Sequence, residues 1–149
     1  MKNDNKKIKI LLIDDNEMMK VYFRDIFWIH GKNDIYDIKM VSSLEEAYKI
    51  LDDKKERPDT IFLDVLMSPS GLTNKCAPAY QMARSLEFIS KVKNNKELSN
   101  INIVIYSGQK EDYLREAAEQ LGINGYLVKG ELMPKEIVSF TDKIHGTNN

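Results

Sequence analysis

The chain has 149 residues, of which 42% are hydrophobic and 30% are charged, and its formal net charge is −1. This composition fits one soluble globular domain, and the balanced charge argues against a nucleic-acid binder. No apolar run approaches the roughly 20 residues that span a bilayer, and no secretory signal is recognisable. The single cysteine, Cys76, cannot form an intramolecular disulfide, so we expect a reducing, cytoplasmic setting.

Short apolar runs alternate with amphipathic segments along the chain, which predicts strands and helices in turn. Strands are expected at residues 8–14, 35–41, 60–65, 101–107 and 125–130. Helices are expected at residues 17–30, 43–53, 85–95, 111–122 and 134–144. This alternation predicts an α/β domain with a doubly wound parallel sheet of five strands, covered on both faces by five helices.

Polar residues follow the predicted strands at their carboxyl ends. Asp14 and Asp15 end the first strand, Asp64 the third, Ser107 the fourth and Lys129 the fifth. The carboxyl ends of parallel strands form the ligand site in such folds, so we expect these side chains to meet. Three carboxylates require a cation, and oxygen ligands suit Mg²⁺. Together with a lysine and a hydroxyl, they are suited to phosphoryl transfer.

Each of these residues has an ordinary structural interpretation when it is taken alone. Asp15 or Asn16 is able to cap the first helix. Lys129 alone would be a surface residue, Ser107 a helix cap, Tyr126 a partly buried strand aromatic, and His30 and His145 surface residues. Trp28 and the first-helix methionines are expected in the core or partly in it, and Lys2, Lys6, Lys7 and Lys9 in a solvated, partly disordered terminus. None of them explains the adjacent aspartates together with Asp64 and Lys129.

In this order and spacing the set resembles the receiver domain of bacterial two-component response regulators, of the chemotaxis-regulator type. The resemblance covers about residues 7–145, and we therefore expect one receiver domain over residues 1–149. The matching residues are Asp14 and Asp15, Asp64, Ser107 with Gly108, Tyr126 and Lys129. The resemblance implies a flavodoxin-like sheet with strand order 2-1-3-4-5.

The resemblance also implies roles for these residues. Asp64 would accept a phosphoryl group from a sensor histidine kinase or phosphotransfer protein in a magnesium-dependent reaction. The implied Mg²⁺ ligands are Asp14, Asp15, Asp64 and the backbone carbonyl of Leu66. Lys129 would contact the phosphoryl oxygens, and Ser107 and Tyr126 would move together as a switch. Their movement would alter the face of the fourth helix, fifth strand and fifth helix, which protein partners contact.

The sequence departs from the family's pattern in two places. Pro69 comes one residue late, and about residues 68–84 form an insertion between the third strand and the third helix, although residues 79–88 are able to extend that helix backward. Long loops are often functional, so either a flap or docking element near Asp64 or a neutral surface loop is expected. Gly130 follows Lys129 where the family often has a cis proline, and glycine keeps this loop permissive.

In the family, the residues two positions beyond the acceptor and two beyond the hydroxyl border the path of the attacking water. Here these water-positioning residues are Leu66 and Gln109. Because Leu66 is apolar, it should not orient water, whereas Gln109 is able to. We therefore expect slow to moderate self-dephosphorylation, and a changed rate when Leu66 is replaced by Asn.

The residues and the resemblance together predict a single-domain response regulator that signals by protein–protein contact. It would be no enzyme beyond catalysing its own phosphorylation and dephosphorylation, and it would bind neither nucleic acid nor membrane. No residues beyond the last predicted helix are expected to form an output domain. A pseudo-receiver that binds partners without being phosphorylated is the first alternative. An aspartate-nucleophile phosphatase is the second, but it needs a second acid two residues after its first-strand nucleophile, unlike the adjacent Asp14 and Asp15.

Overall fold

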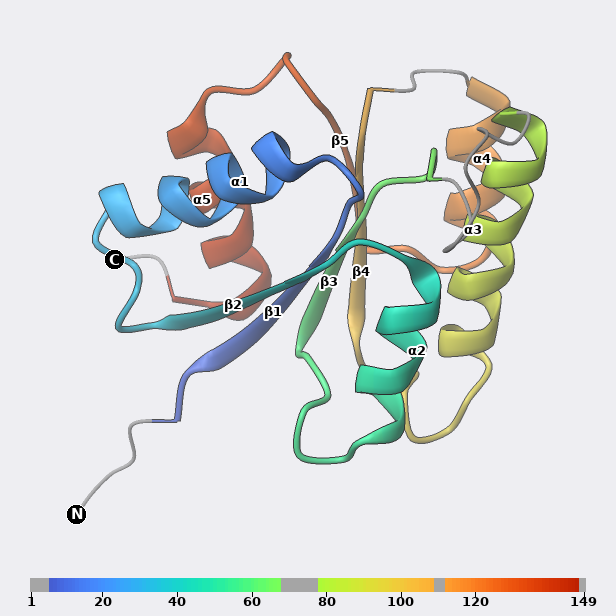
Figure 1. Cartoon of the computed structure of the whole chain (residues 1–149), viewed down its shortest axis with the longest axis horizontal. Helices are drawn as coiled ribbons and strands as arrows, with labels where there is room; N and C mark the ends of the chain where they lie inside the picture. Colours follow the sequence, from blue (N-terminus) through green and yellow to red (C-terminus); the bar gives the residue numbers. More distant parts are fainter. Residues whose placement is uncertain (1–5, 68–77, 109–111, 148–149) are drawn as a thin grey trace.

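The computed structural model describes residues 6–67, 78–108 and 112–147 (Figure 1). Within these residues, one sheet of five parallel strands has the order β2-β1-β3-β4-β5. The strands are β1 (Ile8–Ile13), β2 (Tyr36–Val41), β3 (Thr60–Leu63), β4 (Asn102–Ser107) and β5 (Gly125–Val128). The helices are α1 (Glu17–Ile29), α2 (Leu44–Asp52), α3 (Pro78–Lys93), α4 (Asp112–Gln120) and α5 (Pro134–His145). The predicted fold class and strand order are confirmed.

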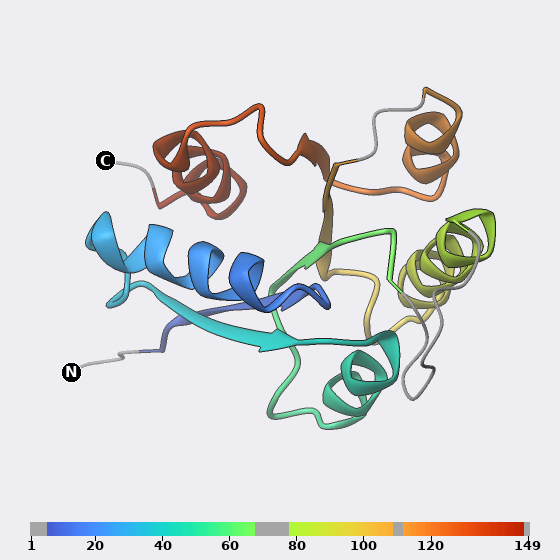
Figure 2. The ribbon, with the colours of Figure 1, turned by 45° about the horizontal axis from the view of Figure 1, so that its top comes forward.

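Helices cover both faces of the sheet, as Figures 1 and 2 show: α1 and α5 lie on one face, and α2, α3 and α4 on the other. Alternate residues of β1 therefore enter different cores. Ile10 and Leu12 pack with α1 and α5, whereas Leu11 and Ile13 pack with the other three helices. The central strands are apolar on both sides because both sides are buried. No helix in the described ranges is long and apolar enough to cross a membrane.

Local sequence signals set several helix ends. The side chain of Asn16 accepts a hydrogen bond from the backbone N–H of Met19 at 3.0 Å and so caps α1. Ser43 caps α2 in the same way, accepting from the N–H of Glu46 at 3.1 Å. Gly146 ends α5 with a φ of +66°, which glycine adopts without steric cost. Asn16 thereby fixes the direction in which the chain leaves the two aspartates.

Helix α3 begins at Pro78, well before the predicted start at residue 85. Proline fits the first position of a helix because the N–H it lacks has no partner there. Residues 78–84 of the expected insertion are therefore the first turns of α3. The backward extension of the helix over residues 79–88 is confirmed, and the predicted start at residue 85 was wrong. The rest of the insertion, residues 68–77 with Cys76, lies outside the described residues.

The outer face of α1 also differs from expectation. The inner face buries Phe23, Ile26 and Phe27, as the periodicity predicts. However, the side chain of Trp28 is 66% exposed and that of Met18 is 81% exposed, so their predicted core positions were wrong. The helix carries apolar residues on two opposite faces, and helical periodicity alone does not say which of them faces the core.

We expect the neighbouring aromatic residues of α1 to differ in their effect on stability. Trp28→Ala should change the free energy of unfolding by no more than about 0.5 kcal/mol, because the ring is largely in water already. The matched change Phe27→Leu, in a side chain that is 1% exposed, should cost about 1 kcal/mol or more. Urea unfolding measures both, and a larger loss for Trp28→Ala would contradict the exposed position of the ring.

Polar contacts fasten the end of α5 to the sheet. The ring Nε2 of His145 lies 2.6 Å from Oγ1 of Thr60, and burial lowers the pKa of this histidine. His145 is thus half-buried rather than a surface residue as predicted, whereas His30 is exposed. The hydroxyl of Tyr36 donates to Asp142 at 2.6 Å and ties α5 to the edge strand.

Candidate functional site

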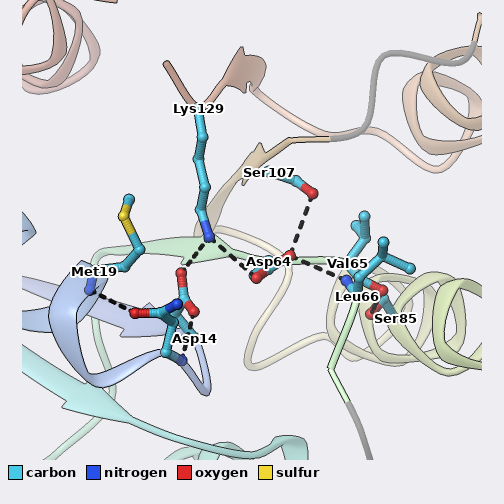
Figure 3. A network of polar contacts seen from close by, with 9 residues as sticks. Asp14, Met19, Asp64, Val65, Leu66, Ser85, Ser107 and Lys129 are labelled. Atoms are coloured by element: carbon cyan, nitrogen blue, oxygen red, sulfur yellow. Dashed lines mark hydrogen bonds and ion pairs between the residues drawn. The ribbon is translucent and has the colours of Figure 1, made fainter. Parts of the chain in front are cut away.

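The polar residues singled out in the sequence come from four neighbouring strands and lie at one edge of the sheet (Figure 3). Asp14 follows β1, Asp64 follows β3, Ser107 ends β4 and Lys129 follows β5. Backbone hydrogen bonds continue between neighbouring strands at this edge. The N–H of Asp64 donates to the carbonyl of Ile13 at 3.0 Å, and that of Lys129 to the carbonyl of Ser107 at 2.8 Å. The sheet itself therefore sets the spacing of these side chains.

An acidic cluster forms the centre of the site. One carboxylate oxygen from each of Asp14, Asp15 and Asp64 lies within 4.8 Å of the others. Asp14 is completely buried, Asp64 is 8% exposed, and Asp15 faces solvent. Three close carboxylates repel one another, and burial of two of them raises the cost of their charge. The cluster therefore favours binding of a cation, which would enter from the solvent-exposed side at Asp15.

Lys129 supplies one positive charge to this cluster. Its ammonium donates to Oδ2 of Asp14 at 2.5 Å and to Oδ2 of Asp64 at 3.1 Å (Figure 3). Burial alone would lower the pKa of Lys129, but the two carboxylates outweigh burial and hold its pKa above the usual value. The lysine is thus charged throughout the neutral range. One lysine facing three carboxylates leaves the site negative.

Asp64 accepts more of the described hydrogen bonds than the other two aspartates of the cluster. Its Oδ1 accepts hydrogen bonds from the backbone N–H of Leu66 at 3.0 Å and from the hydroxyl of Ser107 at 3.2 Å. Burial raises the pKa of the Asp64 carboxyl, and the charge of Asp14 raises it further, while Lys129 and the Leu66 N–H act in the opposite direction. The net shift is upward, so an uncompensated negative charge is unfavourable here. A metal ion or an electrophile that takes up this charge would be stabilised.

The donor set fits a small divalent cation. Carboxylate oxygens are the ligands that Mg²⁺ prefers, and Mg²⁺ is usually held by one or two carboxylates together with water and a phosphate. Asp14, Asp15 and Asp64 supply such oxygens, with the exposed Asp15 leaving room for water. The hydrogen bond described for Leu66 is that of its N–H, so a metal bond from its carbonyl stays a prediction.

Two further residues were predicted to belong to the site. Tyr126 lies away from the acidic cluster, and Gln109 is outside the described residues. The Tyr126 ring is half-buried in β5, and the guanidinium of Arg115 lies 5.4 Å from its centroid. This contact joins β5 to α4 on the face where a switch was expected. Gly130, directly after Lys129, has a φ of +86°, so the departure from proline suits a left-handed turn.

Three supporting residues were not recognised as part of the site from the sequence. The N–H of Asn16 donates to Oδ1 of Asp14 at 2.9 Å, although only its capping role was considered. The hydroxyl of Ser85 donates to the carbonyl of Val65 at 3.0 Å and holds the segment after Asp64 against α3. The ammonium of Lys129 lies 5.7 Å from the centroid of the buried Tyr106 ring. No sequence motif marks Ser85 or Tyr106, because their roles depend on packing across separate elements.

Comparison with known proteins identifies the fold. The chain matches no protein-family model and no curated protein sequence. It is similar to the structure of a response regulator from Thermotoga maritima, with a TM-score of 0.72, 15% identity, and coverage of 95% of this chain and 99% of that one. It is also similar to a signal receiver domain of a two-component histidine kinase from Clostridium thermocellum, with a TM-score of 0.71, 22% identity, and coverage of 93% and 98%.

A third similar structure carries a metal. It is the receiver domain of a sensor histidine kinase from Pseudomonas aeruginosa, with magnesium coordinated in its active-site cleft. Its TM-score is 0.68 at 17% identity, with coverage of 95% of this chain and 99% of that one. The protein described here therefore has the fold of the receiver domains of two-component systems.

Proposed function

We propose that this chain is a receiver domain that accepts a phosphoryl group on Asp64 and signals through contact with other proteins. One observation carries the proposal: the ammonium of Lys129 bridges the buried carboxylates of Asp64 and Asp14, with Asp15 beside them, at the carboxyl edge of a receiver-like sheet. The chain would act as a signalling protein, not as an enzyme with a small-molecule substrate. Its only chemistry would be gain and loss of its own phosphoryl group.

The chemistry follows from the positions of these groups. A carboxylate oxygen of Asp64 attacks phosphorus, a new O–P bond forms, and the bond from phosphorus to the donor's histidine nitrogen breaks. Lys129 is positioned to turn from the carboxylates toward the incoming phosphoryl oxygens, where its charge offsets theirs. The hydroxyl of Ser107 already points at Asp64 and is able to donate to the same group. Mg²⁺ held by Asp14, Asp15, Asp64 and the Leu66 carbonyl would supply further charge neutralisation.

Exposed apolar side chains support the proposal that the chain contacts other proteins. The outer face of α1 begins at Met18, next to the acidic cluster, and continues along the helix to Ile29, which is 74% exposed. We infer that a protein donor covers this face while its phosphohistidine reaches Asp64. On the expected output face, Tyr113 of α4 and Met133 before α5 are both more than half exposed. A rearrangement of Ser107 and Tyr126 on phosphorylation would change the surface near them.

The lifetime of the phosphoryl group would depend on access of water to Asp64. Leu66 is partly buried and packs against the core on the side of α3. Its apolar side chain offers no hydrogen bond to an attacking water. This supports the inference that hydrolysis of the acyl phosphate is slow to moderate.

The direct test is the mass of the intact protein after incubation with acetyl phosphate and Mg²⁺. We expect a gain of one phosphoryl group in the wild type, and none in Asp64→Asn or in EDTA. A matched control is Asp52→Asn, an exposed aspartate at the end of α2, which should be phosphorylated like the wild type. If the wild type gains no phosphoryl group but still binds Mg²⁺, the pseudo-receiver alternative becomes equal to this proposal, and incubation with a phosphorylated histidine kinase decides between them. If Asp64→Asn is also phosphorylated, the acceptor is wrong.

A further inference from the structure

A concentration of unpaired positive charge lies at the opposite end of the sheet from the acidic cluster. A surface pocket of about 390 Å³, hereafter the basic pocket, is lined by Lys6, Lys7, Lys9, Lys54, Lys55, Arg57 and Asp59. These residues precede or begin β1 and β3, whereas the proposed phosphorylation site follows those strands (Figure 1). At about 3.3 Å per residue, the length of β1 alone separates the two by about 20 Å.

The basic pocket is assembled from two segments that are far apart in the sequence. The N–H of Lys9 donates to the Asp59 carboxylate at 2.8 Å, and the N–H of Asp59 donates to the carbonyl of Lys9 at 2.7 Å. The ammonium of Lys9 also donates to the carbonyl of Lys55. Arg57 is held by the carbonyl of Leu51 at 2.7 Å. The beginning of β1 at Lys9 is therefore fixed beside the loop between α2 and β3, and the exposed Lys6 and Lys7 directly precede it.

Four of these cations have no acidic partner within the described chain. Lys6, Lys7, Lys54 and Lys55 are exposed and make no ion pair among the described residues. Two nearby acids are paired with other cations, Glu97 with Arg57 and Glu56 with Lys39, and Asp53 accepts a hydrogen bond from the backbone N–H of Lys55. The Asp59 carboxylate, which lines the pocket, accepts the Lys9 N–H.

From this charge distribution we propose that the basic pocket docks a short acidic polypeptide segment. Exposed lysines are flexible point charges, which suit several carboxylates in a mobile segment rather than one group of fixed geometry. The lining contains no aromatic side chain on which a base would stack. The whole chain has a net charge of −1. A nucleic acid longer than the pocket would therefore also contact surface that carries no excess positive charge, which does not favour its binding. A volume of about 390 Å³ accommodates a few residues of such a segment.

The location of the basic pocket determines what docking there does. Because it lies at the far end of the strands from Asp64, a bound acidic segment leaves the acidic cluster open. A partner is therefore held to the chain in both the phosphorylated and the unphosphorylated state. This inference does not rest on the proposed phosphoryl transfer.

Binding of a fluorescent poly-glutamate peptide to the full chain, followed by anisotropy at low salt, tests the proposal. The double variant Lys54→Glu/Lys55→Glu should bind about tenfold more weakly or worse, which corresponds to about 1.4 kcal/mol. The matched variant Lys135→Glu/Lys143→Glu changes two exposed lysines of α5 by the same net charge and should bind within about twofold of the wild type. Binding should weaken as salt is added, because exposed charges are screened.

Three results would overturn the proposal: no peptide binding by the wild type, equal loss in the two double variants, or tighter binding of a single-stranded oligonucleotide of equal charge. The last would assign the pocket to nucleic acid instead. Lys54→Gln/Lys55→Gln removes charge without reversing it and should give an intermediate loss. Thermal unfolding of each variant shows that it is folded before binding is compared.

Discussion

Replacing Lys129 with methionine is expected to lower the free energy of unfolding by about 3–5 kcal/mol at neutral pH in EDTA. The substitution keeps most of the volume of the side chain but removes the cation that faces Asp14 at 2.5 Å and Asp64 at 3.1 Å. Two carboxylates then remain buried together without a compensating charge. Urea unfolding measures the loss. Lys135→Met, at an exposed lysine of α5, is the control and should change stability by no more than about 0.5 kcal/mol.

The response of Lys129→Met to metal and pH distinguishes an electrostatic cost from lost packing. Mg²⁺ should stabilise the variant more than the wild type, because the ion replaces the missing charge beside the carboxylates. The pKa of Lys129 is raised, so its contribution in the wild type is fully present below the usual lysine pKa and is lost only as pH rises through its higher folded value. At acid pH the deficit should shrink as Asp64 becomes protonated. A deficit independent of both pH and Mg²⁺ would indicate a packing defect instead.

The arrangement of the site was predictable from the sequence because it depends on sheet topology. Once five alternating strands and helices are recognised, parallel pairing places residues that end strands at one edge, whatever their separation along the chain. Asp14, Asp64, Ser107 and Lys129 meet for this reason. The same rule gives no information on Ser85, whose hydroxyl reaches the segment after Asp64 from the middle of α3.

Three other features were not predictable from local patterns. The start of α3 at Pro78 was left open, because the sequence pattern allowed residues 79–88 to extend the helix backward but did not decide between helix and loop. Trp28 was assigned to the core because periodicity identifies apolar faces but not which of two faces is covered. The basic pocket was missed because its lysines belong to two distant segments that meet only through pairing around Lys9 and Asp59. In each case a tertiary contact decides what the local sequence leaves open.

Asp64→Asn is expected to abolish phosphorylation while raising stability by about 1–2 kcal/mol in EDTA at neutral pH. Burial makes the ionised carboxylate costly, and Asp14 repels it. The amide keeps an oxygen that is able to accept hydrogen bonds from Leu66 and Ser107. Lys129 keeps its ion pair with Asp14, so the main contacts survive. The gain is modest because the ion pair with Lys129 is lost at the same time. A large loss of stability in EDTA would contradict this account.

The pH dependence gives the sharper form of the Asp64 prediction. The pKa of Asp64 is raised in the folded state, so its ionisation opposes folding. Below the unfolded aspartate value of about 4 the carboxyl is neutral in both states, and wild type and Asp64→Asn should differ little. As pH rises from there through the higher folded value, the wild type should lose stability relative to the variant. The difference in free energy of unfolding should then stay constant.

Mg²⁺ should narrow this gap between the two proteins, because the wild type retains the full set of carboxylate ligands and gains more from the ion. Urea unfolding across this pH range, with and without Mg²⁺, measures the gap, and a gap that closes with rising pH in EDTA would mean that the carboxylate stabilises the fold. The proposed phosphoacceptor is thus expected to carry a cost in stability when no cation is bound.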